Sequence, residues 1–468
     1  MTPPTLRHAA PAPLLPLLLL LFLSALPLRA QRAPDTRADS AARARGHWRA
    51  AGQAYRAQRW PEALRAAHEA RSAWPAQPFY LLGLASIAAR AGDTAQAAEA
   101  LGAYADLGLG ADLAPDEDFA ALHQAPALQA VAERLRANLA PLARSRVAFR
   151  LDGAGKDFFP EGIACEGRSG VCFMGSLRHR TVLRVAKDGA ARELVPSGRD
   201  GLLGAMALGL SSDGRRLWVA SVALPQTQGL AAADSGGAAL HAFDTRTGAL
   251  LRRLAFPRDS IPANPGDLLV ARNGEVFVSD SRRGLLWRVP PTGDTMAVFA
   301  RSPLLFSPQG IAESADGRRL YVADYSLGIV AVERATGAVR PVAAPAGTTT
   351  VGIDGLARSG EWLVGVQNGV RPARVVRLRL GADPYALAAL EVLDRNLPIA
   401  TEPTSGSMVG GEYWYVANSQ WEAYDAAGVL KPGAELGVPV VLRVGVVGPL
   451  APVAPVGGKT GAVAPVGP

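Results

Sequence analysis

The sequence lacks the short motifs that mark several common enzyme classes. It contains no G-x-S-x-G nucleophile elbow, no G-x-x-x-x-G-K-[ST] phosphate loop, no zinc-ligand pair of histidines and no dinucleotide fingerprint. These absences argue against serine hydrolases, P-loop nucleotide hydrolases, zinc proteases and Rossmann-type dehydrogenases. Histidine is scarce, and His68, His123, His179 and His241 all lie away from the repeat position that is identified below.

Lysine is also rare and occurs only at positions 156, 187, 431 and 459. The positive charge behind the formal net charge of +8 therefore comes almost entirely from arginines, which are scattered along the chain singly or in pairs. Scattered charge of this kind is typical of a solvated surface rather than of a binding stripe. We predict no nucleic-acid partner.

One long apolar run stands out, and it lies at the N-terminus. Arg7 precedes an apolar stretch from Leu14 to Leu26, and Ala30 offers a small residue for cleavage. The stretch is short for a bilayer span and Pro16 interrupts it, which favours a signal peptide over residues 1–30, with an uncleaved anchor as the alternative. This interpretation predicts a periplasmic or secreted protein without an integral membrane segment after cleavage.

The chain has only two cysteines, Cys165 and Cys172, and they flank the short turn EGRSG. An exported protein meets an oxidising compartment, which favours a disulfide between them over the alternative of two reduced thiols. Neither is a good nucleophile candidate, since no histidine is close in sequence and a disulfide would consume both. There is no cysteine near the cleavage site, which argues against a lipid-anchored protein.

A phrase of about sixteen residues recurs six times. MALGLSSDGRRLWVAS begins at Met206 and QGIAESADGRRLYVAD at Gln309; looser copies begin at Glu161, Gly266, Asp354 and Ser405. Each copy is an apolar strand, a glycine turn and a β-branched or aromatic strand, the pattern of a β-hairpin. The starts lie roughly 40 to 60 residues apart, the period of four-stranded propeller blades.

Between the copies lies a second hairpin, with turns that end at Gly189, Gly248, Gly293 and Gly337. Two hairpins make one blade, so the sequence predicts a mainly β fold with a six-bladed propeller over residues 145–446. The last blade has one strand too few. The segment Arg146 to Leu151 precedes the first blade, and we expect it to pair with the last blade and close the ring, which removes open sheet edges.

Residues 41–142 are rich in alanine and helical in pattern. The stretch from Trp48 to Tyr55 fits the W-x-x-L-G-x-x-Y opening of a tetratricopeptide repeat, with Ala51 in place of leucine, and a poorer copy begins near Tyr80. Residues 118–139 would then cap the exposed apolar face. We predict a small tetratricopeptide-like domain, which either recruits a protein partner or simply docks on the propeller.

Two further segments complete the organisation. The loop 418–439 carries Trp421 and Tyr424, whose rings either bind a sugar or other planar ligand or pin the loop to its blade. The tail 447–468 is composed largely of Gly, Pro, Ala and Val, which predicts disorder.

The innermost strands of a propeller begin near its axis, so residues at the same repeat position converge. That position holds a mixed set of side chains: Glu161, Met206, Gly266, Gln309, Asp354 and Ser405. Asp267 follows directly after Gly266. Carboxylate, amide and hydroxyl oxygens around one axis suit a hard cation such as calcium.

A family resemblance rests on the six repeated phrases, on FPEGIA around Glu161 and on DGLA around Asp354. On these motifs, residues 145–446 resemble the six-bladed propellers of the senescence marker protein/gluconolactonase superfamily, which is related to strictosidine synthase-like and NHL-type propellers. In metal-dependent members a glutamate, two asparagines and an aspartate hold a divalent ion, commonly calcium, above which lactones or phosphoesters are hydrolysed. Glu161 and Asp354 match that pattern. The asparagines do not, because Gly266 and Gln309 stand in their places.

The resemblance implies a divalent-metal-dependent hydrolase of a lactone or similar ester that binds a small molecule in the propeller channel. Glu161, Gln309 and Asp354 are the predicted metal ligands, and Asp354 or Asp267 is the predicted general base. The alternative is a propeller without chemistry, a scaffold or ligand-binding module whose helical repeats recruit a partner; Glu161 and Asp354 would then serve only as buried hydrogen-bonding groups.

Overall fold

The computed structural model describes residues 36–450, apart from 76, 114–116 and 123–124. The predicted signal peptide (1–30) and residues 451–468 of the predicted tail lie outside the described residues. Within the described part, no helix has the length and apolar character needed to cross a membrane.

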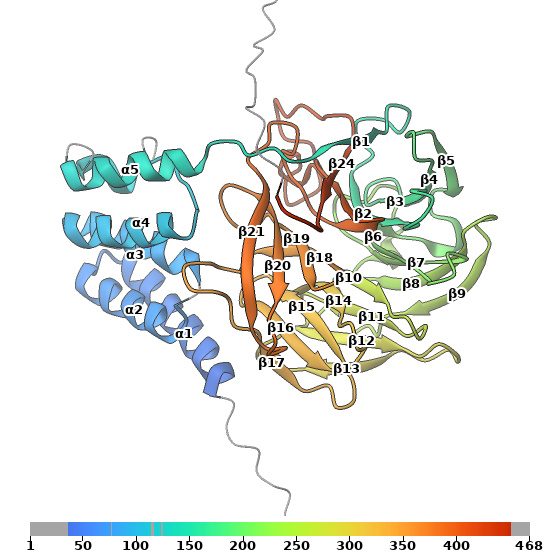
Figure 1. The fold of residues 1–468 in the computed structure, drawn as a ribbon, viewed down its shortest axis with the longest axis horizontal. Coiled ribbons are helices and arrows are strands. Elements are labelled where there is room, and N and C mark those ends of the chain that lie inside the picture. The colour runs from blue at the N-terminus through green and yellow to red at the C-terminus, as the bar shows by residue number, and fades with distance from the viewer. Residues whose placement is uncertain (1–35, 76, 114–116, 123–124, 451–468) are drawn as a thin grey trace, which may run out of the picture. The chain divides into compact units, whose positions relative to one another are not determined.

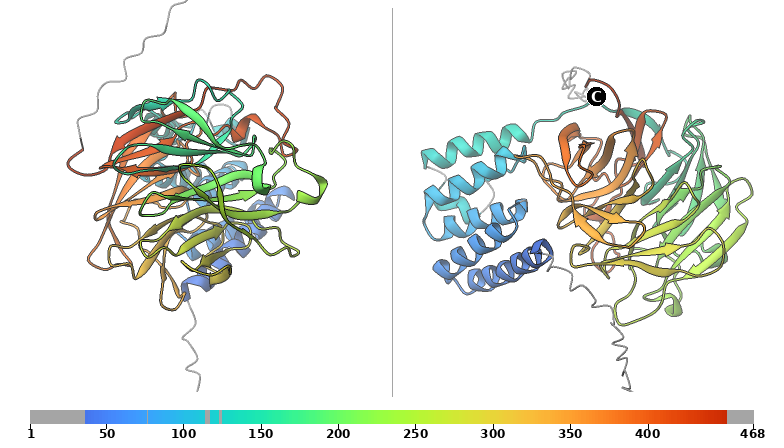
Figure 2. Two further views of the ribbon diagram at one scale, coloured as in Figure 1. Left: turned by 90° about the vertical axis from the view of Figure 1, so that its right-hand side faces the viewer. Right: turned by 60° about the horizontal axis from the view of Figure 1, so that its bottom comes forward.

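Five α-helices are described before the first strand, and each packs on the next in chain order (Figure 2). They are α1 (Thr36–Arg56), α2 (Trp60–Ala73), α3 (Pro78–Arg90), α4 (Thr94–Asp106) and α5 (Pro126–Asn138), with a 3₁₀ turn at Glu117–Leu122. The Asp93 carboxylate starts α4 by accepting the Gln96 N–H at 3.0 Å. A helical region is therefore present; its tetratricopeptide character stays a prediction.

The signature aromatics of this region pack within it. The ring of Trp48 lies 4.9 Å from that of Tyr80, and it covers Gly83, where any side chain would collide with the indole. Tyr55 packs edge-on against Trp60 at 5.5 Å and donates its hydroxyl proton to Asp118 at 2.7 Å. These side chains join neighbouring helices to one another.

The remaining chain forms six antiparallel four-stranded sheets, the predicted propeller (Figure 1). The first three blades are β2–β5 (Pro160–Cys165, Cys172–Ser176, Thr181–Val185, Ala191–Val195), β6–β9 (Gly204–Leu210, Arg216–Val222, Ala238–Asp244, Leu250–Ala255) and β10–β13 (Pro265–Val270, Val276–Asp280, Leu285–Val289, Ala297–Arg301). The next two are β14–β17 (Pro308–Glu313, Arg319–Asp324, Gly328–Glu333, Val339–Pro341) and β18–β21 (Ile353–Ser359, Trp362–Gln367, Arg374–Leu380, Leu387–Arg395).

The sixth blade closes the ring as the sequence predicts. It consists of β22 (Gly406–Val409), β23 (Glu412–Val416), β24 (Val440–Gly445) and, from the other end of the propeller, β1 (Arg146–Arg150). β1 runs antiparallel to β24, with Arg146 opposite Arg443 and Arg150 opposite Val440. The first strands of neighbouring blades contact one another all the way round, including β22 against β2, so the inner strands enclose the axis.

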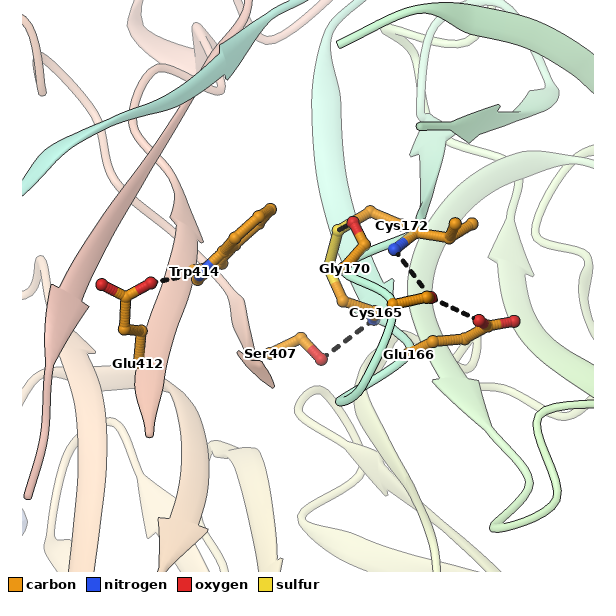
Figure 3. Close-up of a disulfide and its surroundings, with 9 residues drawn as sticks. Cys165, Glu166, Gly170, Cys172, Ser407, Glu412 and Trp414 are labelled. Carbon is orange, nitrogen blue, oxygen red and sulfur yellow. Dashed lines mark hydrogen bonds between the residues drawn. A yellow bond between two sulfur atoms is a disulfide. The ribbon is translucent and has the colours of Figure 1, made fainter. Parts of the chain in front are cut away.

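A disulfide lies beside this closure. Cys165 and Cys172 are opposite each other on β2 and β3 and are bonded, and the Cys165 N–H donates to Ser407 Oγ on β22 at 3.0 Å (Figure 3). The bond therefore reinforces the first hairpin where it faces the last blade.

Candidate functional site

β-Bulges aim the repeat-position side chains at the axis. In the first strands of blades 1, 3, 4 and 5 the pairing register shifts between the first residue and the fourth. The two residues skipped are the pairs Glu161–Gly162, Gly266–Asp267, Gln309–Gly310 and Asp354–Gly355. A bulge frees residues from the ladder and redirects their side chains, which explains how the repeat positions of these four blades converge.

The glycine of the pair allows the inner strands to approach closely. A Cβ at Gly310 would overlap the backbone of Asp354 and Leu356, and one at Gly355 would overlap the backbone of Ser405. Blade 3 reverses the order, so that Gly266 takes the axial position and Asp267 the second. Asp267 therefore leaves the bulge in a different direction from the other acidic residues.

Two cavities meet at the axial residues. The wide cavity, of about 960 Å³, is lined by Gln309, Tyr325, Asn368, Glu402 and Trp421 among others. The narrow cavity, of about 330 Å³, is lined by Asp267 and by residues further along the inner strands. Glu161 and Asp354 line both. The structure thus brings Glu161, Gln309 and Asp354 to one cavity, while Asp267 lines the other.

The carboxylates of Glu161 and Asp354 lie close enough to interact electrostatically and are poorly solvated. Glu161 is 8 % exposed, and burial together with the charge of Asp354 raises its pKa well above the usual range. Burial also raises the pKa of Asp354, although the Asn368 amide, which donates to Asp354 Oδ2 at 2.9 Å, opposes this. Desolvation and like charges both favour the neutral acid, so this pair favours proton uptake or a positively charged ligand.

Asp267 is affected in the same way. Burial raises its pKa to about 7, with a contribution from the charge of Asp354, and hydrogen bonds from backbone N–H groups oppose the rise. One of these is the Leu268 N–H, at 2.7 Å from Oδ1. A carboxyl group with a pKa near neutrality can accept and release a proton at physiological pH.

Gly266 and Gln309 share one space at the axis. A Cβ at Gly266 would collide with Gln309 Oε1, so the longer glutamine side chain uses the space that a side chain at 266 would need. Its amide oxygen lies over the neighbouring blade. Gly266 and Gln309 therefore supply one side-chain oxygen between them, where the superfamily pattern has two asparagines.

The wide cavity also contains two polar residues that the sequence does not predict as site residues, Glu402 and Asn368. Burial raises the pKa of Glu402 to about 7; this residue precedes the first strand of blade 6. Asn368 follows β19, and its Nδ2 donates to Asp354 and to the Pro403 carbonyl, each at 2.9 Å. Its Oδ1 is buried and finds no partner among the described residues. Both lie in loops next to the repeat position, which a comparison of strand starts alone does not cover.

The two aromatic residues of the long loop pack on one ring. Phe159 meets Trp421 edge-on, with centroids 4.9 Å apart, and stacks with Tyr424 at 5.3 Å. Tyr424 is 5 % exposed and lies under the Arg178 guanidinium at 4.8 Å. Trp421 lines the wide cavity and donates its indole N–H to Glu161 Oε2 at 2.9 Å. Trp421 therefore contacts the site directly, and Tyr424 anchors the loop.

A divalent cation at this site would need oxygen ligands from more than the two axial carboxylates. Among the described residues, no group of three or more His, Cys, Asp or Glu side chains is arranged to hold a metal ion. A cation between Glu161 and Asp354 would therefore need amide oxygens as well. Gln309 Oε1 and the unpartnered Asn368 Oδ1 are such oxygens on the same cavity, and an all-oxygen set fits calcium.

The fold is similar to that of several solved propellers. A gluconolactonase from Xanthomonas campestris is 17 % identical over 66 % of this chain and 92 % of its own, with a TM-score of 0.42. A calcium-binding regucalcin from Agrobacterium tumefaciens is 17 % identical over 65 % and 94 %, with a TM-score of 0.44. A virginiamycin B lyase from Staphylococcus aureus is 15 % identical over 64 % and 98 %, with a TM-score of 0.43.

No protein-family model matches the chain, and no curated protein matches it in sequence. The class of protein is therefore defined by the fold: a six-bladed propeller that follows a helical region. The six-bladed propeller architecture that the sequence predicts is confirmed by the six four-stranded sheets.

Proposed function

We propose that this protein is an exported hydrolase of a lactone or similar ester that acts with a divalent cation, calcium in the first instance. The observation that carries the proposal is the pair Glu161 and Asp354, two carboxylates that share one cavity. Glu161 is buried and Asp354 partly so; burial raises the pKa of both, and the charge of Asp354 adds to the rise at Glu161. A structural role alone does not require two like charges to be brought together. The disulfide supports export, since such bonds persist in oxidising compartments.

The residues that would hold the cation are Glu161 and Asp354, assisted by the amide oxygens of Gln309 and Asn368. A bound divalent cation would polarise the carbonyl of the ester and lower the pKa of water. Trp421 fixes one oxygen of Glu161, and the Asn368 amide fixes one oxygen of Asp354. Each carboxylate thus keeps its other oxygen for the ligand.

Hydrolysis also needs a group that takes a proton from water and a group that returns one to the leaving alcohol. Glu402 lies on the wide cavity with a pKa of about 7, so it joins Asp354 as a candidate general base there; Asp267, the other candidate, lines the narrow cavity. The water oxygen bonds to the carbonyl carbon, the carbon–oxygen bond to the alcohol breaks, and the alcohol oxygen takes up the proton.

The test begins with calcium binding to the mature protein by isothermal titration calorimetry, with Glu161→Gln and Asp354→Asn compared to wild type. Asp152→Asn, at an exposed position, is the matched control. We expect one site in wild type and in the control and at least a tenfold loss in each axial variant, since about 1.4 kcal/mol corresponds to tenfold. A panel of lactones and esters, with calcium and with chelator, then tests turnover. Absence of binding, or of turnover with any divalent cation, would refute the proposal.

The alternative, a scaffold whose helices recruit a protein partner near Trp48 and Tyr55, receives less support. Both side chains are used in packing between the helices. Substitution there would disturb the helical region itself rather than a free surface. The hydrolase therefore remains the function that the geometry supports best.

A further inference from the structure

A second, apolar cavity adjoins the wide cavity on the side of the helices. It has a volume of about 410 Å³ and is lined by Pro78, Phe79 and Leu82 of α3 and by Tyr104 of α4. Four residues of the propeller line this cavity and the wide cavity alike: Tyr325, Asn368, Val370 and Arg371. The two cavities therefore meet along this common wall. We call the second cavity the apolar subsite.

The helices are fixed to the common wall by specific contacts. The Gly110 N–H, just after α4, donates to the Arg371 carbonyl at 2.9 Å. Arg374 donates to the Leu107 carbonyl at 3.3 Å, and Val370 is part of the apolar core formed by the helices. A subsite built on such contacts has a defined shape.

Phe79 is the unusual residue of the subsite. It is a large aromatic residue that is 52 % exposed, while its neighbours Pro78 and Tyr80 on α3 are buried. Leu82, one helical turn further on, is only partly buried. Because Phe79 and Leu82 lie beside an apolar cavity and are not fully packed, their side chains are available to a ligand in that cavity.

The two cavities differ sharply in character. The wide cavity presents the carboxyl groups of Glu161, Asp354, Glu402 and Glu422. The subsite presents rings and aliphatic groups, with Arg371 and Asn368 only at the boundary. A ligand that fills both must combine a small polar head without negative charge with an apolar substituent.

We propose that the substrate is a lactone or ester that carries an alkyl chain, with the chain lying in the apolar subsite against Phe79 and Leu82. The polar head is taken from the proposed function, on which this inference rests. The helical region then acts as a wall of the binding site, and Phe79 determines specificity for chain length. A methylene group buried in such a site strengthens binding about fourfold.

Two ring ketones serve as binding probes that cannot be hydrolysed: cyclohexanone and 2-heptylcyclohexanone. We expect the full-length mature protein to bind the heptyl compound at least about 50-fold more tightly, which corresponds to roughly three buried methylenes. Phe79→Ser should reduce that preference about tenfold, since it removes part of one ring contact, and should leave cyclohexanone binding unchanged. Ile261→Ser, at an equally exposed position (48 %) on a propeller loop, is the control.

Turnover of δ-valerolactone and δ-dodecalactone separates this inference from the proposed function. A heptyl preference that Phe79→Ser reduces about tenfold, without turnover of either lactone, would support the subsite and refute the hydrolase. Turnover of both lactones with equal KM, or a heptyl preference that Phe79→Ser leaves intact, would overturn the subsite. Thermal unfolding of each variant shows whether the fold is retained, and Leu82→Ser provides a second, independent reduction of the same preference.

Discussion

Asp267→Asn should make the protein more stable at neutral and alkaline pH but not at acidic pH. An aspartate whose pKa rises from 3.8 to about 7 in the folded protein holds its proton more tightly there than in the unfolded chain. Folding is therefore penalised as pH rises above the unfolded pKa, and the penalty is complete above about pH 7. Asparagine does not ionise, so the variant escapes the penalty.

The magnitude follows from the same pKa. A difference of about three pH units corresponds to about 4 kcal/mol at about 1.4 kcal/mol per unit. Asp267 lines a cavity and keeps part of its surface exposed, so water reduces this figure, and we expect about 1–3 kcal/mol. The asparagine keeps an oxygen that can accept the Leu268 N–H, which limits other losses.

The assay is urea unfolding in chelator at pH 4.5, 6 and 8, with Asp152→Asn as the exposed control. The difference between variant and wild type should be smallest at pH 4.5, which lies just above the unfolded pKa of 3.8, where about a quarter of the full effect is expected; it should grow through pH 6 to its full value at pH 8. A constant difference across this range, or a variant that is less stable at pH 8, would refute the assignment of a raised pKa to Asp267.

Two further predictions concern the site and the ring closure. Asn368→Ala removes the amide that donates to Asp354 and to the Pro403 carbonyl. We expect the free energy of unfolding to fall by about 1–2 kcal/mol. The pKa of Asp354 should rise, which would shift the acidic limb of a kcat/KM profile to higher pH. Phe149→Ala, on β1, removes a 3 % exposed ring packed on Trp414 and should lower the free energy of unfolding by about 3–4 kcal/mol. The control Val147→Ala, at a 40 % exposed position on the same strand, should lower it by less than about 1 kcal/mol. Equal losses of stability would argue that β1 does not close the ring.

The architecture was accessible from the sequence because a propeller is a repeated local pattern. Each blade is specified by its own hairpin turns and alternating strands, and the six copies agree with one another. The closing strand was accessible for a related reason: a blade with three strands leaves an open edge, and β1 was the unassigned strand next to it. Neither inference needs knowledge of contacts between distant side chains.

The site was only partly accessible, since its chemistry depends on such contacts. The alignment of strand starts finds Glu161, Gln309 and Asp354, which do line one cavity. The alignment also places Asp267 correctly, one residue after the repeat position. It cannot reveal that the reversed order Gly266–Asp267 directs this carboxyl group toward the narrow cavity. Glu402 lies in a loop between repeats, where no periodic signal exists, and Asn368 lies at the far end of its repeat, which an alignment of strand starts does not consider.

The exchange at Gly266 and Gln309 shows most clearly what a sequence comparison misses. Judged one position at a time, Gly266 offers no side-chain oxygen and Gln309 is not the asparagine of the resembled pattern, which weakens the case for a cation. In three dimensions the glycine makes room for the glutamine oxygen, and Asn368 adds an amide oxygen from another loop of the same cavity. The number of oxygens available around Glu161 and Asp354 therefore depends on the packing of three blades, and not on any one blade's motif. For this reason calcium binding, rather than closer comparison of motifs, is the decisive measurement.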